Sequence, residues 1–173
     1  MIQAMSTELP TSPEGLRQAF ARFPTGVAVV CARDSDGTDG GMTANAICSL
    51  SLDPLLLLIC FENEARTLPL VERTGRFSIS ILAEDGRDLA DRFASKLDEG
   101  EKLRGIGVRE ELGVPVLEDA IAWAVCSLKE TLPGGDHQIV IGEVEALGSA
   151  EGRPLVWYGG TYGSLSDAER STS

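Results

Sequence analysis

Hydroxyl and amide side chains gather in one short part of the chain, residues 43–53. The small threonine, alanine and serine residues there keep the backbone accessible, so a flat or phosphorylated ligand could approach closely and still meet hydrogen-bond donors. Ser49 and Ser51 alternate with leucines, which places both hydroxyls on one face of an extended chain. The Asp53-Pro54 pair then turns the chain. We interpret residues 43–53 as one wall of a ligand site.

A second group of polar residues follows the apolar segment 55–61, where Arg66 and Thr67 stand side by side. A guanidinium near hydroxyl donors can hold a phosphate. Together with Ser49 and Ser51, these residues form the candidate phosphate-binding set. The alternative is that the two serines are polar residues of an edge strand and that Arg66 is a solvated loop charge.

Two single residues could also meet a ring. The amide of Asn45 can donate and accept at once, which suits the imide edge of a flavin or the edge of a nucleobase, although an asparagine after a glycine-rich segment is also a common turn former. His137, the one histidine, could contact a bound ring or supply a proton, or it could be a structural residue at a hairpin corner. The sequence contains neither a dinucleotide-binding glycine fingerprint nor a P-loop, so a nucleotide would have to bind in another way.

Composition limits the classes of partner. The chain carries 27 acidic and 15 basic residues, for a net charge of -12, which disfavours nucleic acid and anionic membrane surfaces. The apolar segment 55–61 is too short to span a membrane, and the first residues contain no hydrophobic signal core. The four cysteines form no Cys-x-x-Cys pair, and with a single histidine no metal site is expected. We therefore predict a cytoplasmic protein that binds no metal, nucleic acid or membrane.

The elements that would position these groups are mostly strands. Helical spacing predicts three short helices, over residues 12–23, 67–73 and 85–97. Alternation and apolar runs predict strands over 27–32, 49–52, 55–61, 77–82, 121–131, 137–147 and 154–158. Residues 98–117 are rich in charge and glycine, and we expect a long, partly mobile connection there. Since strands and helices do not alternate regularly, an antiparallel barrel with helices packed outside fits best.

Six blocks carry a resemblance to a known family. They occur in order over roughly residues 16–163: residues 20–27 (FARFPTGV), 43–46 (TANA), 49–54 (SLSLDP), 77–82 (FSISIL), 89–94 (LADRFA) and 135–137 (GDH). The chain resembles the flavin reductase family with the FMN-binding split barrel, which includes the reductase components of two-component monooxygenases. Each block is common by itself, but their ordered combination is specific.

The resemblance implies a mainly β (α+β) fold, an antiparallel split β-barrel with two or three peripheral helices. It implies one flavin-binding domain over residues 1–173, with flexible ends at 1–11 and 165–173, that forms a homodimer with flavin near the subunit interface. The implied activity is NAD(P)H:flavin oxidoreductase, which reduces FMN or FAD by hydride transfer and supplies a separate monooxygenase. Because the two cofactors carry this reaction, few catalytic side chains are needed.

Residue by residue, the resemblance places Thr43–Ala46 along the flavin ring and Arg66 with Thr67 toward its phosphate. His137 is the implied catalytic residue, near the ring where the nicotinamide approaches. Ala65 stands where the family often has a phosphate-contacting serine, so FMN and FAD both stay open, as do NADH and NADPH. The implied cofactor-binding residues are Thr25, Gly26, Thr43, Ala44, Asn45, Ala46, Ser49, Ser51, Phe61, Glu62, Arg66, Thr67, Phe93 and Tyr162.

Two other functions stay open at this point. The chain could be a split-barrel protein that binds flavin or haem without turnover. It could also be an oxidase that retains its flavin and acts directly on a small organic substrate. Tight co-purification of a coloured ligand without nicotinamide oxidation would favour the first, and bleaching of bound flavin by an organic substrate alone would favour the second.

Overall fold

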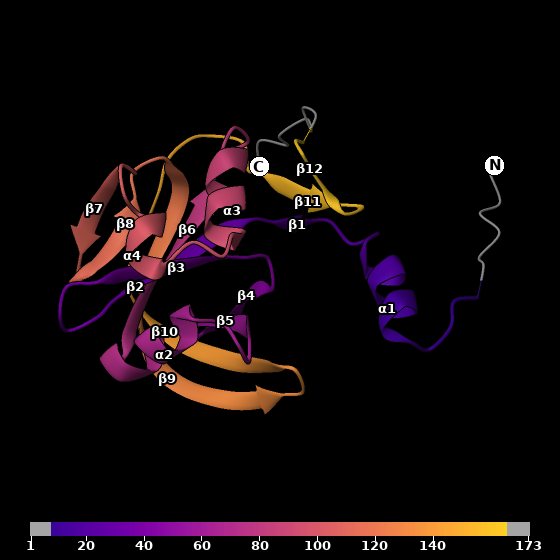
Figure 1. Ribbon diagram of the computed structural model, residues 1–173, viewed down its shortest axis with the longest axis horizontal. Helices are drawn as coiled ribbons and strands as arrows, with labels where there is room; N and C mark the ends of the chain where they lie inside the picture. The colour runs from indigo at the N-terminus through magenta and orange to yellow at the C-terminus, as the bar shows by residue number, and fades with distance from the viewer. Residues whose placement is uncertain (1–7, 166–173) are drawn as a thin grey trace.

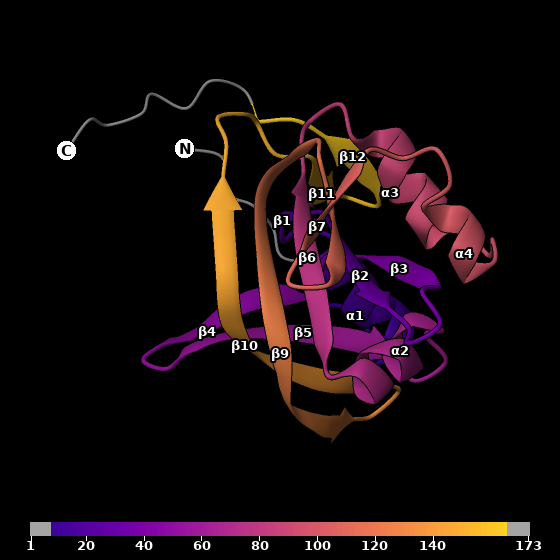
Figure 2. The same cartoon turned by 90° about the vertical axis from the view of Figure 1, so that its left-hand side faces the viewer.

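A seven-stranded antiparallel sheet is the largest element of residues 8–165, the part of the chain that the computed structural model describes. Its strands lie in the order β3-β2-β6-β9-β10-β5-β4, and the long β9–β10 hairpin bends so that the sheet curls toward a barrel (Figure 2). The seven strands are β2 (Ala28–Arg33), β3 (Asp39–Ala44), β4 (Ile47–Leu52), β5 (Leu55–Glu62), β6 (Arg76–Leu82), β9 (Ala120–Gly134) and β10 (His137–Ser149). The predicted antiparallel, mainly β fold is confirmed.

Two smaller sheets complete the β structure of the described residues. One contains β1 (Thr25–Gly26), β11 (Val156–Tyr158) and β12 (Thr161–Gly163), and the other pairs β7 (Val108–Glu111) with β8 (Val114–Leu117). β1 pairs with β11, which holds the segment after the first helix beside the end of the chain (Figure 1).

Four short helices occur in the described residues: α1 (Pro13–Phe20), α2 (Thr67–Thr74), α3 (Arg87–Ala94) and α4 (Glu99–Lys102). Ser12 caps α1, because its hydroxyl oxygen accepts a hydrogen bond from the Gly15 amide at 3.1 Å. Gly75 ends α2 in the left-handed conformation, with φ of 67°. α1 stands away from the body of the molecule, whereas α3 and α4 lie against it (Figure 1). None of the described helices is long and apolar enough to cross a membrane.

The prediction of a long, partly mobile connection over residues 98–117 is wrong. This segment contains α4 and the β7–β8 hairpin. Glu111 pairs with Val114, so Leu112 and Gly113 form a two-residue turn, and both have positive φ, 50° and 86°. Such a turn normally contains asparagine, aspartate or glycine at its first position. A leucine there gives no turn signal, which explains why the sequence pattern did not reveal the hairpin.

The core lies on both sides of β2. Val30 and Phe77 belong to one cluster of buried residues, and Val29 and Phe93 belong to another. Successive residues of a strand point to opposite faces, so a strand that is apolar at every position can supply both clusters. β2 therefore contributes to both parts of the core, and β3, which leads into the predicted ligand site, pairs directly with it.

The predicted flexible ends, residues 1–11 and 165–173, fall mostly on residues 1–7 and 166–173, which lie outside the described residues. The assignment of the whole chain to a single domain stays a prediction.

Candidate functional site

A cleft of about 590 Å³ opens where β3, β5, α2 and α3 come together. Its size is in the range of pockets that bind small molecules and cofactors. Nine of the predicted site residues line it, although they come from distant parts of the sequence. They are Thr43 and Ala44 at the end of β3, Asn45 and Ala46 after it, Glu62 at the end of β5, Arg66 and Thr67 at the start of α2, Phe93 on α3 and His137 at the start of β10.

The ring end of the cleft, defined by residues 43–46, presents mainly small side chains and backbone. The Thr43 hydroxyl donates to the Ala90 carbonyl oxygen at 2.6 Å, which ties β3 to α3. Asn45 is exposed, and its Nδ2 donates to Thr25 Oγ1 over 3.3 Å. Because that contact uses only the amide nitrogen, the carbonyl oxygen of Asn45 can still accept from a ligand.

His137 lies on the rim of the cleft, paired with Glu62 across the β5–β10 ladder. Its Nδ1 is 2.7 Å from Asp136 Oδ1. The hydrogen bond to His137 lowers the pKa of the Asp136 carboxyl below its usual value. With Nδ1–H directed at this carboxylate, Nε2 is the ring nitrogen that can face a ligand.

The phosphate end of the cleft, defined by Arg66 and Thr67, is already paired within the chain. Arg66 donates to the Leu97 carbonyl oxygen, and its guanidinium lies 3.7 Å from Asp98 and 3.6 Å from Glu99. Thr67 is buried, and its hydroxyl donates to Glu99 Oε2 at 3.1 Å. Of the residues predicted to bind phosphate, Arg66 and Thr67 lie in the cleft, but their partners in the structure are carboxylates and a carbonyl.

Besides Glu64, sequence reasoning missed three charged residues of this cleft: Lys96, Glu99 and Lys102. Lys102 is 4% exposed, and its Nζ lies 3.0 Å from Glu99 Oε1 and donates to the Gly41 carbonyl oxygen at 2.9 Å. Glu99 Oε2 accepts from the Gly41 amide at 2.8 Å. All three residues lie in or beside the segment that was expected to be a loop, and the only available signal was the helical i,i+3 spacing of Glu99 and Lys102.

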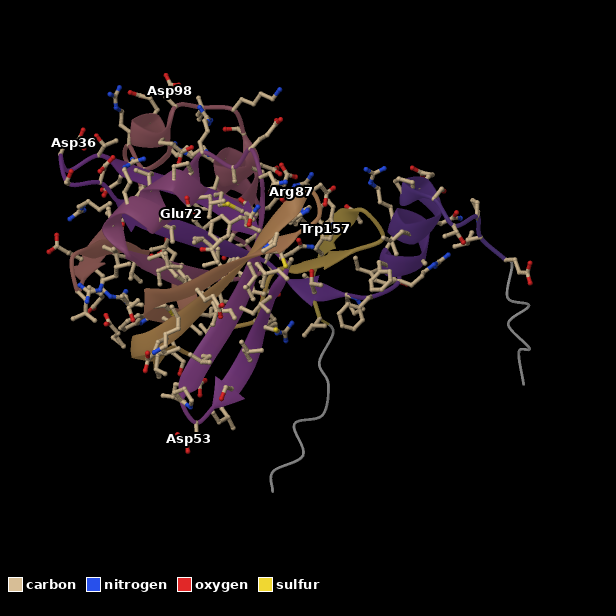
Figure 3. The ribbon with its side chains drawn as sticks, turned by 90° about the horizontal axis from the view of Figure 1, so that it is seen from below. Asp36, Asp53, Glu72, Arg87, Asp98 and Trp157 are labelled. Atoms are coloured by element: carbon tan, nitrogen blue, oxygen red, sulfur yellow. The ribbon has the colours of Figure 1, made fainter. Side chains whose placement is uncertain are left out.

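Six predicted residues do not line this cleft. Thr25, Gly26 and Ser49 line an adjacent apolar hollow of about 490 Å³, which shares Ala44 and Asn45 with the cleft. Ser51 lies near the tip of the β4–β5 hairpin, where it accepts from the Asp53 amide at 3.2 Å. Asp53 and Asp98 are at opposite ends of the molecule (Figure 3), so within one chain Ser51 is remote from Arg66.

Phe61, predicted to contact the cofactor, is fully buried in the core. Its neighbours Cys60 and Glu62 line the cleft instead. The physical reason is the alternation of side chains along β5, which directs adjacent residues to opposite faces.

Tyr162 lines a smaller hollow that meets the cleft at Thr43, Ala44 and Asn45. Its ring packs edge-on against Trp157, with centroids 4.9 Å apart, and the Arg87 guanidinium lies 5.6 Å from the Tyr162 ring centre. Figure 3 shows Arg87 and Trp157 approaching one another from α3 and β11. Partial burial, followed by the charge of Asp91, raises the pKa of the Tyr162 hydroxyl. These contacts make an aromatic wall beside the ring end.

A curled antiparallel sheet whose cleft has small residues at one end and cations at the other defines a β-barrel protein of the nucleotide-cofactor-binding class. The chain belongs to the flavin reductase like domain family, which matches residues 20–166. The predicted family is thereby confirmed.

Individual relatives agree with this assignment over most of the chain. The chain is 40% identical over 155 residues to the actinorhodin polyketide dimerase of Streptomyces coelicolor, covering 88% of this chain and 86% of the relative. It is 38% identical over 156 residues to an NADH-dependent flavin reductase of a Rhodococcus species, covering 89% and 87%. The solved structure of the styrene monooxygenase flavin reductase from Pseudomonas putida S12 superposes with a TM-score of 0.81 at 30% identity, covering 88% of this chain and 99% of that one.

These findings confirm the predicted split-barrel fold and the predicted class of enzyme, an NAD(P)H-dependent flavin reductase with flavin and nicotinamide cofactors. The roles of the individual residues stay predictions.

Proposed function

We propose that the protein transfers hydride from NADH or NADPH to FMN or FAD held in the cleft, and that reduced flavin then leaves for a separate monooxygenase in the cytoplasm. One observation carries the proposal. A single cleft joins the small residues 43–46, the Arg66 cation at the start of α2 and His137. The styrene monooxygenase flavin reductase among the relatives supports a monooxygenase as the recipient.

The residues of the cleft fit a flavin. Flavin and nicotinamide supply the electron transfer when bound, so the chain has to bind, orient and exclude water. The small side chains of residues 43–46 allow a planar ring to approach the backbone, and the Asn45 carbonyl oxygen can accept from a ring N–H. Arg66, Lys96 and Thr67 lie on the side where a phosphate would extend. The donor set thus matches a flat ring with an anionic tail.

His137 is proposed to act in the reaction from the rim of the cleft, where the nicotinamide would approach. Its Nδ1 is held by Asp136, so Nε2 is free to contact the nicotinamide carboxamide or to hold a proton at the ring. The aromatic pair Trp157 and Tyr162 is proposed to close the remaining side.

We further propose that the working form is a homodimer. Phe20 and Phe23, on and after α1, are 66% and 67% exposed, and Leu147 on β10 is 65% exposed. Phe23 and Leu147 both line the apolar hollow beside the cleft. A second copy that covers this surface would remove apolar area from water and would bring the interface to Asn45. This arrangement would place Thr25, Gly26 and Ser49 next to the flavin.

The test mixes purified protein with free FMN or FAD and with NADH or NADPH, and follows nicotinamide absorbance without oxygenase. We expect oxidation that requires both protein and flavin. Failure with every donor and flavin pair would refute the reductase. Reduced flavin that the protein has formed without oxygen is then mixed with a two-component monooxygenase, its substrate and oxygen, and the oxygenated product is measured to test the diffusible supply.

A further inference from the structure

The phosphate end of the cleft contains an ion pair, Glu99–Lys102, that no sequence motif predicted. Glu99 and Lys102, on the single turn of α4, both reach into the cleft, and Lys102 is almost fully buried. The Glu99 carboxylate also contacts Thr67 and Arg66, the two residues expected to hold the flavin phosphate. A carboxylate therefore already occupies part of the donor set that a phosphate would use.

The fold makes a fitted place for this carboxylate. A side chain at Gly40 would put its Cβ 2.7 Å from Glu99 Oε2, so a glycine is needed for Glu99 to pack against the edge of β3. On the other side of the carboxylate, Oε1 is near enough to Lys102 for ion pairing but makes no aligned hydrogen bond with any described residue. Buried carboxylate oxygens are usually satisfied. A residue kept only to tie α4 to β3 would not need a buried carboxylate oxygen that lacks a hydrogen bond.

The charged side chains that line the cleft balance one another. The carboxylates that line it are Glu62, Glu64 and Glu99, and the cations are Arg66, Lys96 and Lys102. Three negative and three positive charges cancel. A flavin phosphate entering the cleft would meet donors, but the charges that line the cleft sum to zero.

We infer that Glu99 is a specificity determinant that offsets the positive charge of Arg66 and Lys102 at the phosphate end, so that the phosphate of a flavin adds little to binding. The inference rests on the proposed flavin site. The wild type is then selective for the isoalloxazine ring and indifferent to the tail. Riboflavin, FMN and FAD bind with dissociation constants within about threefold of one another, because an anionic tail gains little from a neutral surface.

The test measures binding of riboflavin, FMN and FAD by quenching of flavin fluorescence in three proteins: wild type, Glu99→Gln and Asp98→Asn. Glutamine keeps the shape and an acceptor for Gly41 and Thr67 but removes the charge. Because Glu99 is largely buried, we expect Glu99→Gln to tighten FMN binding by about tenfold at low salt and to leave riboflavin unchanged. Asp98→Asn removes the same charge at the neighbouring residue and is the control. Because the Asp98 side chain is 92% exposed, this variant should alter FMN binding by less than about twofold.

Lys102→Met gives a second test with the opposite sign, and it serves even if Glu99→Gln does not fold. It leaves the cleft with an excess negative charge, so FMN should bind about tenfold more weakly while riboflavin is unchanged. Far-ultraviolet circular dichroism and thermal unfolding establish that each variant is folded.

Equal changes for riboflavin and FMN, or no change for FMN in a folded variant, would overturn the inference and assign the pair a purely structural role. This outcome differs from failure of the proposed function. If the wild type binds no flavin at all, riboflavin included, the flavin site itself is refuted, and the inference falls with it.

Discussion

The two ends of the cleft are built in different ways. The ring end consists of consecutive residues, 43–46, that offer backbone and small side chains, and the side chains of Thr43 and Asn45 donate to Ala90 and Thr25. The phosphate end consists of charged residues from α2 and α4 that are already paired with one another. The ring end is therefore open to a ligand as it stands, whereas the phosphate end must share its donors. Recognition of the ring should dominate binding, and each prediction below tests that contrast.

The largest effect is expected from filling the ring end. Ala46 is exposed and lines the cleft, so Ala46→Trp should occupy the place of the flavin without disturbing the core. We expect flavin-dependent nicotinamide oxidation to fall by at least about 100-fold, since a misplaced ring loses its reactive geometry. The thermal midpoint should stay near that of the wild type. Ala150→Trp, at another exposed position, is the control and should remain active.

Breaking the proposed dimer comes next. Leu147→Glu places a charge on the exposed apolar hollow, where burial of the leucine would contribute about 2 kcal/mol per subunit. We expect sedimentation to show monomers at concentrations where the wild type is dimeric, together with weaker flavin binding. Ser149→Glu, exposed at the end of the same strand, is the matched control. A wild type that sediments as a monomer would refute the proposed homodimer.

His137 tests whether the rim acts in the reaction rather than in binding. His137→Ala should slow nicotinamide-dependent flavin reduction by about tenfold, within the range for lost proton or positioning groups. The flavin dissociation constant should change by less than about twofold, because the ring end keeps its contacts. Stopped-flow reduction and fluorescence quenching separate the two quantities. Unchanged reduction kinetics would return His137 to a structural role at the hairpin.

The smallest effect is expected from Arg66→Met at the phosphate end. The Arg66 side chain is 45% exposed and its charge is shared with Asp98 and Glu99, so FMN binding should weaken by only about threefold. The change should shrink further in high salt. Riboflavin is the internal control. A loss for FMN as large as that of Ala46→Trp would contradict the difference between the two ends.

The contrast also explains which parts of the site could be predicted from the sequence. Residues 43–46 form a local motif, so their composition predicts a ring contact before any fold is known. The partners of Arg66 could not be predicted, because Glu99 and Lys102 reach it only through the packing of α4 against β3. Their segment also concealed a hairpin, since Leu112 adopts a positive φ without a typical turn residue.

Two misplaced residues have simple causes. Phe61 was grouped with Glu62 although neighbours along a strand face opposite sides. Ser49 and Ser51 have the right chemistry for phosphate, but β4 carries them toward the hairpin tip, away from α2. The strands and their antiparallel pairing were easier to predict, because alternation is repeated along each of them.

The charge-balanced end of the cleft has a consequence for the time that a flavin stays bound. Differences in affinity among related complexes arise mostly from the rate of dissociation. Because the phosphate tail of a flavin meets no net charge, it adds no second attachment to the protein. The residence time of the flavin is then set by the ring alone. Binding and release of the tail would then not limit turnover. Each protein molecule would reduce many flavins in succession and would not retain one.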